Sequence, residues 1–138
     1  MNEKHPDLAT EIHTARCLCG NITIEATGPA KYTEYCHCKW CQQASGSAFL
    51  PLVVFDKEKV IVTSGKLSQY NSSHGNLRGF CPDCGSTMSF QSQHHFDIAL
   101  GVMDNPGKFK ADQHIWCKSR ISHVNIADDL PRYEESDD

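Results

Sequence analysis

Eight cysteines among 138 residues constrain this chain more than any other feature, because seven of them fall into three short clusters. Two clusters are pairs that end in glycine, and the third is a run of three thiols between them. The clustered residues are Cys17 and Cys19, then Cys36, Cys38 and Cys41, and finally Cys81 and Cys84. Reducing compartments do not sustain disulfide frameworks, so in a cytosolic chain such spacings favour metal ligands over disulfides. The sequence therefore predicts metal-binding turns.

The two glycine-ended pairs predict one closed zinc site. The segment Cys81-Pro-Asp-Cys-Gly85 has the zinc-knuckle form, in which proline and aspartate set a tight turn and glycine permits a positive φ. The segment Cys17-Leu-Cys-Gly20 is one residue shorter and also ends in glycine. A structural zinc takes four thiolates at about 2.3 Å, so the two turns must converge on one ion. A thioredoxin-type redox pair at Cys81 and Cys84 is a weaker alternative, because no βαβ pattern follows them.

The central trio differs from the pairs, because Cys41 is followed by Gln42 and not by glycine. Cys38 and Cys41 are three residues apart and can share one side of a helical turn, with Cys36 entering from a preceding strand. Pairing the glycine-ended turns leaves this trio with three ligands, so we expect an open fourth position, as in catalytic zinc sites. A second structural site, closed by Cys117 or by a histidine, is the alternative that spacing leaves open.

Composition excludes several classes of protein. Hydrophobic residues make up 39% and charged residues 22%, which is ordinary globular usage for one domain. A formal net charge of −4 and a pI near 6.0 argue against a nucleic-acid binder with a broad basic face. Residues 1–14 lack the apolar core of a secretory signal, and the longest apolar run, residues 48–55, is too short to span a membrane. We therefore expect a cytoplasmic protein.

Hydrophobic alternation and turn residues predict a mainly β fold. We expect strands over residues 21–26, 32–36, 48–55, 60–63, 67–70, 78–80, 87–90, 96–102 and 115–124. One helical turn is expected over residues 42–45, ended by Gly46. For the chain as a whole we expect a polar N-terminal segment at 1–14, one zinc-binding domain at 15–127 and an acidic tail at 128–138 that is solvated and partly disordered.

With these motifs placed, the sequence resembles the family of glutathione-dependent formaldehyde-activating enzymes, which includes the centromere protein V domain. The resemblance covers roughly residues 17–135. It depends on several ordered motifs: Cys17-Leu-Cys-Gly20, Cys36-His-Cys-Lys-Trp-Cys41 with Gly46-Ser-Ala-Phe49, Phe80-Cys-Pro-Asp-Cys-Gly-Ser86, Gly101-Val-Met-Asp104, His114-Ile-Trp116 and Leu130-Pro-Arg-Tyr-Glu134. Cys117, directly after the fifth motif, departs from the pattern.

The resemblance implies a single-domain β-tent fold with two zinc ions per chain. It implies a structural zinc at Cys17, Cys19, Cys81 and Cys84, and a second, catalytic zinc at Cys36, Cys38 and Cys41. The implied activity is that of a carbon–sulfur lyase, which makes and breaks the bond between glutathione and formaldehyde in S-hydroxymethylglutathione. A non-catalytic zinc module that binds a protein partner is the competing function, because fold and metal sites transfer within a family more safely than substrates do.

For most of the remaining polar and aromatic residues the sequence predicts structural roles. His37 lies between two ligands and, in an extended chain, points to the opposite face. Surface or core roles are expected for His94, His95, His114 and His123, and turn roles for Ser72 and Ser73. Trp40 and Trp116 are expected to be packing residues, with lining of a pocket as the alternative. Arg78, Lys39 and Arg120 are candidates for contact with glutathione carboxylates. Cys117 is read as a small buried hydrophobe.

Overall fold

The computed structural model describes residues 9–136, which form two β-sheets and one short α-helix. The smaller sheet contains β1 (Ile12–Arg16), β2 (Thr23–Thr27) and β5 (Val60–Ser64), in the order β1-β2-β5. The larger contains β3 (Tyr32–Cys36), β4 (Leu50–Asp56), β6 (Ser68–Ser73), β7 (Asn76–Phe80), β8 (Thr87–Gln91), β9 (His95–Ala99) and β10 (Gln113–Ile115). Its order is β10-β3-β4-β9-β8-β7-β6, and only the β10–β3 pair is parallel. The predicted mainly β fold is confirmed.

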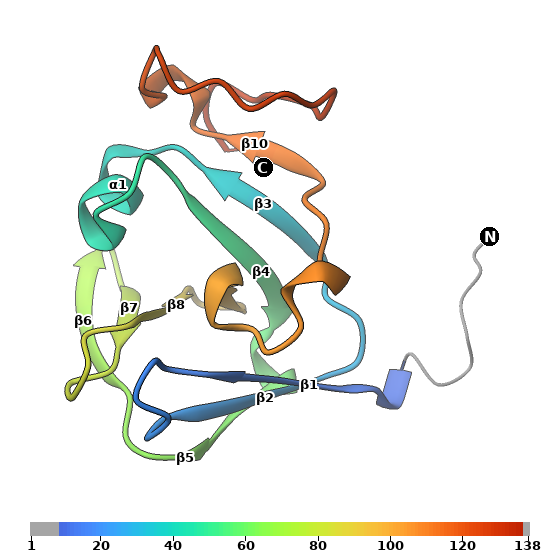
Figure 1. Ribbon diagram of the computed structural model, residues 1–138, viewed down its shortest axis with the longest axis vertical. Coiled ribbons are helices and arrows are strands. Elements are labelled where there is room, and N and C mark those ends of the chain that lie inside the picture. The colour runs from blue at the N-terminus through green and yellow to red at the C-terminus, as the bar shows by residue number, and fades with distance from the viewer. Residues whose placement is uncertain (1–8, 137–138) are drawn as a thin grey trace.

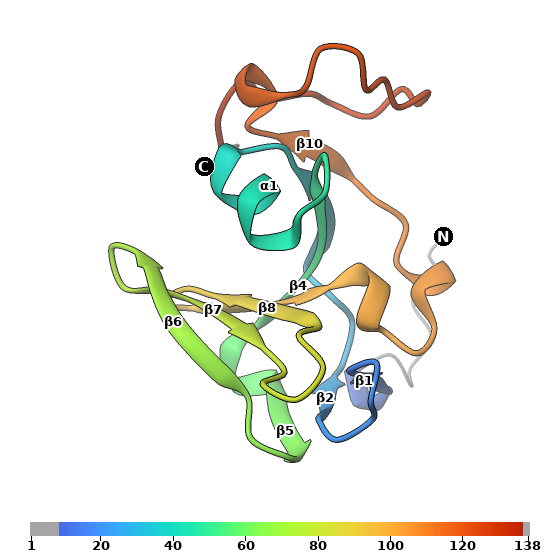
Figure 2. The same ribbon diagram turned by 60° about the vertical axis from the view of Figure 1, so that its left-hand side comes forward.

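The two sheets are arranged around the interior of the molecule like the sides of a tent (Figure 1). The small sheet forms the base, β3 and β4 rise from it on one side, and β6, β7 and β8 stand on the other. The α1 helix (Lys39–Ser45) lies above β6, β7 and β8, as the turned view in Figure 2 also shows. Alternate residues of β3, β4 and β9 therefore face two different interiors.

The two interiors have different sizes and compositions. The main core lies against the small sheet and includes Ile22, Ile24, Phe55, Met88 and Ile98. A smaller apolar cluster on the other face of the large sheet consists of Cys36, Cys41, Leu50, Leu52, Ala99 and Ile115. Two cysteines of the predicted trio thus belong to the smaller cluster, on the face away from the main core.

The helix begins and ends where side-chain and backbone capping permit. Cys38 is its N-cap, with Sγ accepting a hydrogen bond from the backbone N–H of Cys41 at 3.3 Å. Gly46 ends the helix with a φ of 70°, and its N–H donates to the Gln42 carbonyl. The predicted stop at Gly46 is confirmed, and the helix begins earlier than predicted, so that it includes Cys41.

Three other elements differ from the predicted pattern. β1 begins at Ile12, inside the segment interpreted as a polar N-terminus, and pairs along its whole length with β2. The strand predicted over 115–124 is wrong: β10 ends at Ile115 because Trp116 takes a φ of 58°, and a 3₁₀ turn follows at Cys117–Ser119. The strand predicted over 96–102 ends at Ala99, where a 3₁₀ turn over Leu100–Val102 begins.

The acidic C-terminal segment is exposed over residues 131–136 but has a defined path beside β10 (Figure 1). The backbone N–H of His114 donates to the Pro131 carbonyl, and that of Tyr133 donates to the His114 carbonyl, both at 2.9 Å. The backbone N–H of Cys117 also donates to the Tyr133 carbonyl, at 2.9 Å. The disorder predicted for the tail is therefore wrong for these residues, while residues 137 and 138 and residues 1–8 lie outside the described part. The domain limits at 15 and 127 stay predictions.

A membrane crossing by a helix would need a long apolar helix, and residues 9–136 contain none.

Candidate metal centres and the adjoining pocket

The first cysteine cluster forms where the β1–β2 turn meets the β7–β8 turn. The sulfurs of Cys17 and Cys19 are 3.6 Å apart, and those of Cys19 and Cys81 are 3.8 Å apart. With Cys84 they form a group of four thiols whose sulfurs all lie within 4.8 Å of one another. These separations are close to the edge of a tetrahedron of thiolates around one zinc-sized ion. We refer to these four residues as the closed cluster.

Glycine shapes both turns of the closed cluster, as the sequence predicts. Gly20 has a φ of 82° and Gly85 a φ of 79°, values that favour glycine because it has no Cβ. The backbone N–H of Ile22 donates to the Cys17 sulfur at 3.3 Å. The two turns are also joined by a side-chain bond from Asn21 to Asp83 at 3.0 Å. The four sulfurs are therefore held by backbone geometry and by contacts between the turns.

The second cluster contains Cys36, Cys38 and Cys41, whose three sulfurs also lie within 4.8 Å of one another. Cys36 is the last residue of β3, Cys38 caps α1, and Cys41 lies in its first turn. No other cysteine, histidine or carboxylate among residues 9–136 joins this group. We refer to these three residues as the open trio. Cys117 is not part of it, so the alternative of closure by Cys117 finds no support in the described residues.

The three sulfurs of the open trio compete for protons. Hydrogen bonds with Cys36 and then with Cys41 lower the pKa of the Cys38 thiol. Hydrogen bonds with Cys38 and then with Cys41 raise the pKa of the Cys36 thiol. A positive charge nearby, on Arg78, also lowers the pKa of Cys38. Such competition is the property of thiols that are close enough to share one cation as thiolates.

All three thiols of the open trio line a pocket of about 520 Å³. A row of paired residues from five strands crosses the sheet face beneath it, in the order Tyr32, Val54, Asp97, Phe90 and Arg78. Four of these five residues, all except Val54, line the pocket. Trp40 and Trp116 line it as well, and Trp40 is 52% exposed. Both tryptophans therefore line a pocket, which was the alternative to packing that the sequence left open.

Arg78 is the polar residue that approaches the open trio most directly. It is 5% exposed, and its two terminal nitrogens donate to the Cys41 sulfur at 3.6 and 3.7 Å. Its Nε donates to the Ser72 hydroxyl at 3.1 Å, and its guanidinium lies 4.8 Å from the centre of the Phe90 ring. Arg78 thus places a positive charge beside the thiols, whereas the sequence suggested only a contact with the carboxylates of glutathione.

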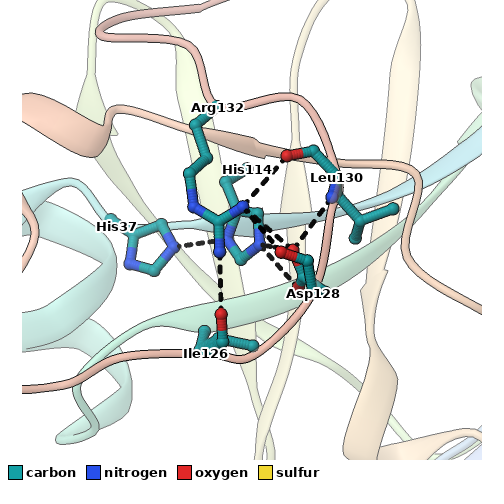
Figure 3. Close-up of polar contacts among 6 residues, drawn as sticks. All are labelled: His37, His114, Ile126, Asp128, Leu130 and Arg132. Atoms are coloured by element: carbon teal, nitrogen blue, oxygen red, sulfur yellow. Dashed lines mark hydrogen bonds and ion pairs between the residues drawn. The ribbon is translucent and has the colours of Figure 1, made fainter.

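A hydrogen-bond chain starts at His37, which lies between Cys36 and Cys38 in the sequence (Figure 3). His37 Nε2 is 2.9 Å from His114 Nδ1, and His114 Nε2 is 2.9 Å from an Asp128 carboxylate oxygen. Arg132 donates to the same carboxylate at 3.0 Å. Since a carboxylate only accepts, His114 donates through Nε2 and its Nδ1 accepts from His37. Burial, followed by electrostatic interaction with His114, Arg120 and Arg132, lowers the pKa of His37 to about 4, so it stays neutral.

This hydrogen-bond chain gives a structural role to His37, which lies between two thiols of the open trio, and to His114. His37 does not join the group of three sulfurs and does not line their pocket, and its ring is hydrogen-bonded to the buried His114 on β10. Asp128 comes from the segment interpreted as a tail, so its contribution could not be read from local spacing. The chain ties the turn that bears Cys36 and Cys38 to the C-terminal segment.

Two buried acids in the pocket were not singled out in the sequence. Glu34 precedes the trio on β3, and Asp97 lies on β9 between two apolar residues, Phe96 and Ile98. The one signal for Asp97 was an acid inside a strand with apolar residues on both faces. His95 and Ser73 also line this pocket, whereas Arg120 donates to carbonyls of its own loop at 121–124.

The order of the cysteine clusters along the chain agrees with that of one protein family. The sequence model of the family described as "glutathione-dependent formaldehyde-activating enzyme" matches residues 12–119. The match covers well over half of the chain, so this protein belongs to that family. The matched range begins at β1, before the motifs at which the resemblance was seen to start, and ends at the 3₁₀ turn after Trp116.

A solved structure supports the fold independently. The chain is similar to a protein of Rhodobacter sphaeroides in a crystal structure, with a TM-score of 0.56 and 16% sequence identity. The similarity covers 86% of this chain and 98% of that one. At this identity it shows that the two share a fold. A search of curated proteins finds no match.

Proposed function

We propose that this protein is a zinc-dependent carbon–sulfur lyase that makes or cleaves a glutathione–aldehyde conjugate such as S-hydroxymethylglutathione. The open trio, Cys36, Cys38 and Cys41, would hold the catalytic zinc. The closed cluster, Cys17, Cys19, Cys81 and Cys84, would hold a structural zinc. The observation that carries this proposal is that the trio lines a pocket of about 520 Å³ and has no fourth ligand among the described residues. Family membership supports glutathione and formaldehyde as the reactants.

The ligand chemistry fits zinc. Thiolates are soft ligands that select zinc over magnesium or calcium, and neither cluster includes a carboxylate. When bound, zinc lowers the pKa of a thiol in its fourth position, as it does for water. A zinc ion with three thiolates carries one net negative charge, which the adjacent guanidinium of Arg78 balances.

The reaction itself forms one bond between the sulfur of glutathione and the aldehyde carbon. The carbon–oxygen double bond becomes a single bond, and the thiol proton ends on the oxygen, so that no oxidant or reductant is needed. The reverse reaction breaks the carbon–sulfur bond and returns the proton to sulfur. The residues of the chain orient and desolvate the reactants: Leu52 and Phe90 line an apolar floor, and Arg78 stabilises negative charge beside Cys41.

The pocket favours an enzyme over a non-catalytic zinc module. A module for a protein partner would need two closed metal sites, and the described residues close only one of the two clusters. We also propose that the protein works in the cytoplasm, because eight free cysteines are best maintained in a reducing compartment.

A pair of cysteine variants tests the proposal. In zinc-loaded protein, Cys41→Ser is expected to reduce turnover of formaldehyde and glutathione at least 100-fold, because the trio loses a ligand next to Arg78. Cys117→Ser is the matched control, since that thiol lies outside both clusters, and its turnover should stay within about twofold of the wild type. Wild-type turnover by Cys41→Ser would show that the trio is not the catalytic site.

A further inference from the structure

Asp97 is a buried acid whose environment does not satisfy it. It is 6% exposed, and its Oδ1 atom has no hydrogen-bond partner. No cationic side chain of residues 9–136 forms an ion pair with it. A buried carboxyl without a partner costs free energy, so native proteins rarely retain one without a reason. Here the carboxyl lines the same pocket as the open trio.

A second acid, Glu34, lines the pocket from the neighbouring part of the sheet. Glu34 pairs with Leu52 on β4, and Asp97 pairs with Val54, so the two acids lie on one face with a single strand between them. Burial, and after it the negative charge of Glu34, raises the pKa of Asp97. The other charged or titratable residues that line the pocket, besides the thiols, are Tyr32, Lys39, Arg78 and His95. Two carboxyl groups therefore line the pocket, and His95 is the titratable residue that lies two positions from Asp97 on β9.

Arg78 lines the same pocket two strands away from Asp97, with Phe90 between them in the row of paired residues. Arg78 contacts the Cys41 sulfur and the Ser72 hydroxyl, so its guanidinium is directed at the thiol cluster. The pocket thus contains three thiols with Arg78 beside Cys41, and it also contains the carboxyl group of Asp97, two strands away from Arg78 in the row of paired residues. A ligand that spans it would carry a sulfur at one end and a positive group at the other.

We propose that Asp97, supported by Glu34, is the subsite for the ammonium group of the thiol substrate. This inference deepens the proposed function and rests on it, because it assumes that the substrate sulfur lies at the open trio. The substrate class it names is a thiol with a primary amine at the far end of a flexible arm, such as the γ-glutamyl arm of glutathione. A thiol without that amine would leave the Asp97 carboxyl without a partner.

The spacing within the sheet agrees with this class of substrate. Asp97 and Arg78 are separated by Phe90 in one row of paired residues, so two strand spacings of about 4.8 Å place their Cα atoms roughly 10 Å apart. Eight covalent bonds separate the sulfur from the α-amino nitrogen of glutathione. At the rise of an extended chain, three bonds per 3.5 Å, this arm spans about 9 Å. The arm is therefore about as long as the separation of Asp97 from Arg78, the residue that contacts Cys41.

A ligand pair tests the subsite without any mutation. The probes are glutathione and its deaminated analogue, glutaryl-cysteinyl-glycine, and the measurement is the dissociation constant for zinc-loaded protein by titration calorimetry. Wild-type protein is expected to bind glutathione at least 10-fold more tightly than the analogue, because a charge-assisted hydrogen bond is lost with the amine. Equal affinity for the two thiols would overturn the subsite and leave the proposed function intact. Binding of neither thiol would overturn both.

Two variants test whether Asp97 causes the preference for glutathione over its deaminated analogue. Asp97→Asn keeps the shape of the side chain and is expected to weaken glutathione binding at least 10-fold while changing the affinity for the deaminated analogue less than twofold. Asp56→Asn makes the same chemical change at the exposed end of β4, and both affinities should stay at the wild-type values. Equal weakening of both ligands in Asp97→Asn would contradict an ammonium subsite at this residue.

Discussion

The two cysteine clusters use the same ligand type but obtain it in different ways. The closed cluster takes two thiols from each of two turns, one on each sheet, and these turns surround the position of an ion from both sides. The open trio takes all three thiols from one segment, the end of β3 and the start of α1, so one side remains for the pocket. The comparison teaches that thiols from two turns can form a group of four, whereas thiols from one segment form a group of three that lines a pocket.

The largest expected effect separates the clusters by stability. Cys81→Ser removes a fully buried ligand that joins two sheets, and we expect the free energy of unfolding to fall by at least about 3 kcal/mol. Cys41→Ser should cost less stability, because its cluster joins only neighbouring elements, but should abolish turnover. Chemical denaturation of both variants at equal zinc concentration measures the difference. Equal losses of stability would remove the distinction between the clusters.

The next effect concerns Arg78, whose guanidinium contacts a sulfur of the open trio. We expect Arg78→Gln to lower the metal affinity of the open trio 10- to 100-fold, or about 1.4–2.8 kcal/mol, because it removes a buried positive charge 3.6 Å from a ligand sulfur. Competition with a zinc chelator would show one zinc released more easily and the other unchanged. Arg16→Gln, an exposed pair with Asp104, is the control and should release neither.

A pH-dependent effect is expected at Asp97. Because burial raises its pKa in the folded state, the native protein binds this proton more strongly than the unfolded chain does. The penalty is therefore absent below the unfolded pKa of about 4 and grows as the pH rises through the folded-state value. Asp97→Asn should raise the free energy of unfolding by about 1–3 kcal/mol at pH 7.5, with the gain disappearing toward pH 4. A gain that is constant with pH would contradict this explanation.

The smallest effect tests the turns themselves. Gly85→Ala and Gly46→Ala both place a Cβ in the left-handed region, with no atom within 4 Å to clash, so each should cost about 1 kcal/mol of backbone strain. They should differ in metal binding: Gly85 directly follows a ligand, whereas Gly46 lies beyond the helix that bears Cys41. Chelator competition is expected to show weaker retention at the closed cluster in Gly85→Ala only. Weaker retention in both would mean that glycine does not distinguish the clusters.

The sequence was informative where chemistry and geometry are local. The spacing of cysteines, the glycines at 20, 46 and 85, and the position of Cys41 in a helical turn all follow from neighbours in the chain. The residues that surround the trio come from distant elements: Arg78 from β7, Asp97 from β9 and Asp128 from the C-terminal segment. Their convergence depends on strand order and register, which short motifs do not specify.

The same reason explains the elements that were missed. β1 lies in a polar segment and is held as a strand by its antiparallel pairing with β2, which overrides its weak local propensity. The strand predicted over 115–124 had suitable β-branched residues, but the left-handed conformation of Trp116 ends the pairing. Pairing with another strand decided the first case, and the backbone conformation of one residue decided the second.

The most direct test of the open trio is native mass spectrometry of the zinc-loaded chain, with and without saturating glutathione. We expect two zinc ions per chain, and an additional mass of one glutathione that is lost in Cys41→Ser and retained in Cys117→Ser. Two tightly held zinc ions with no glutathione adduct would contradict an open catalytic position at Cys36, Cys38 and Cys41.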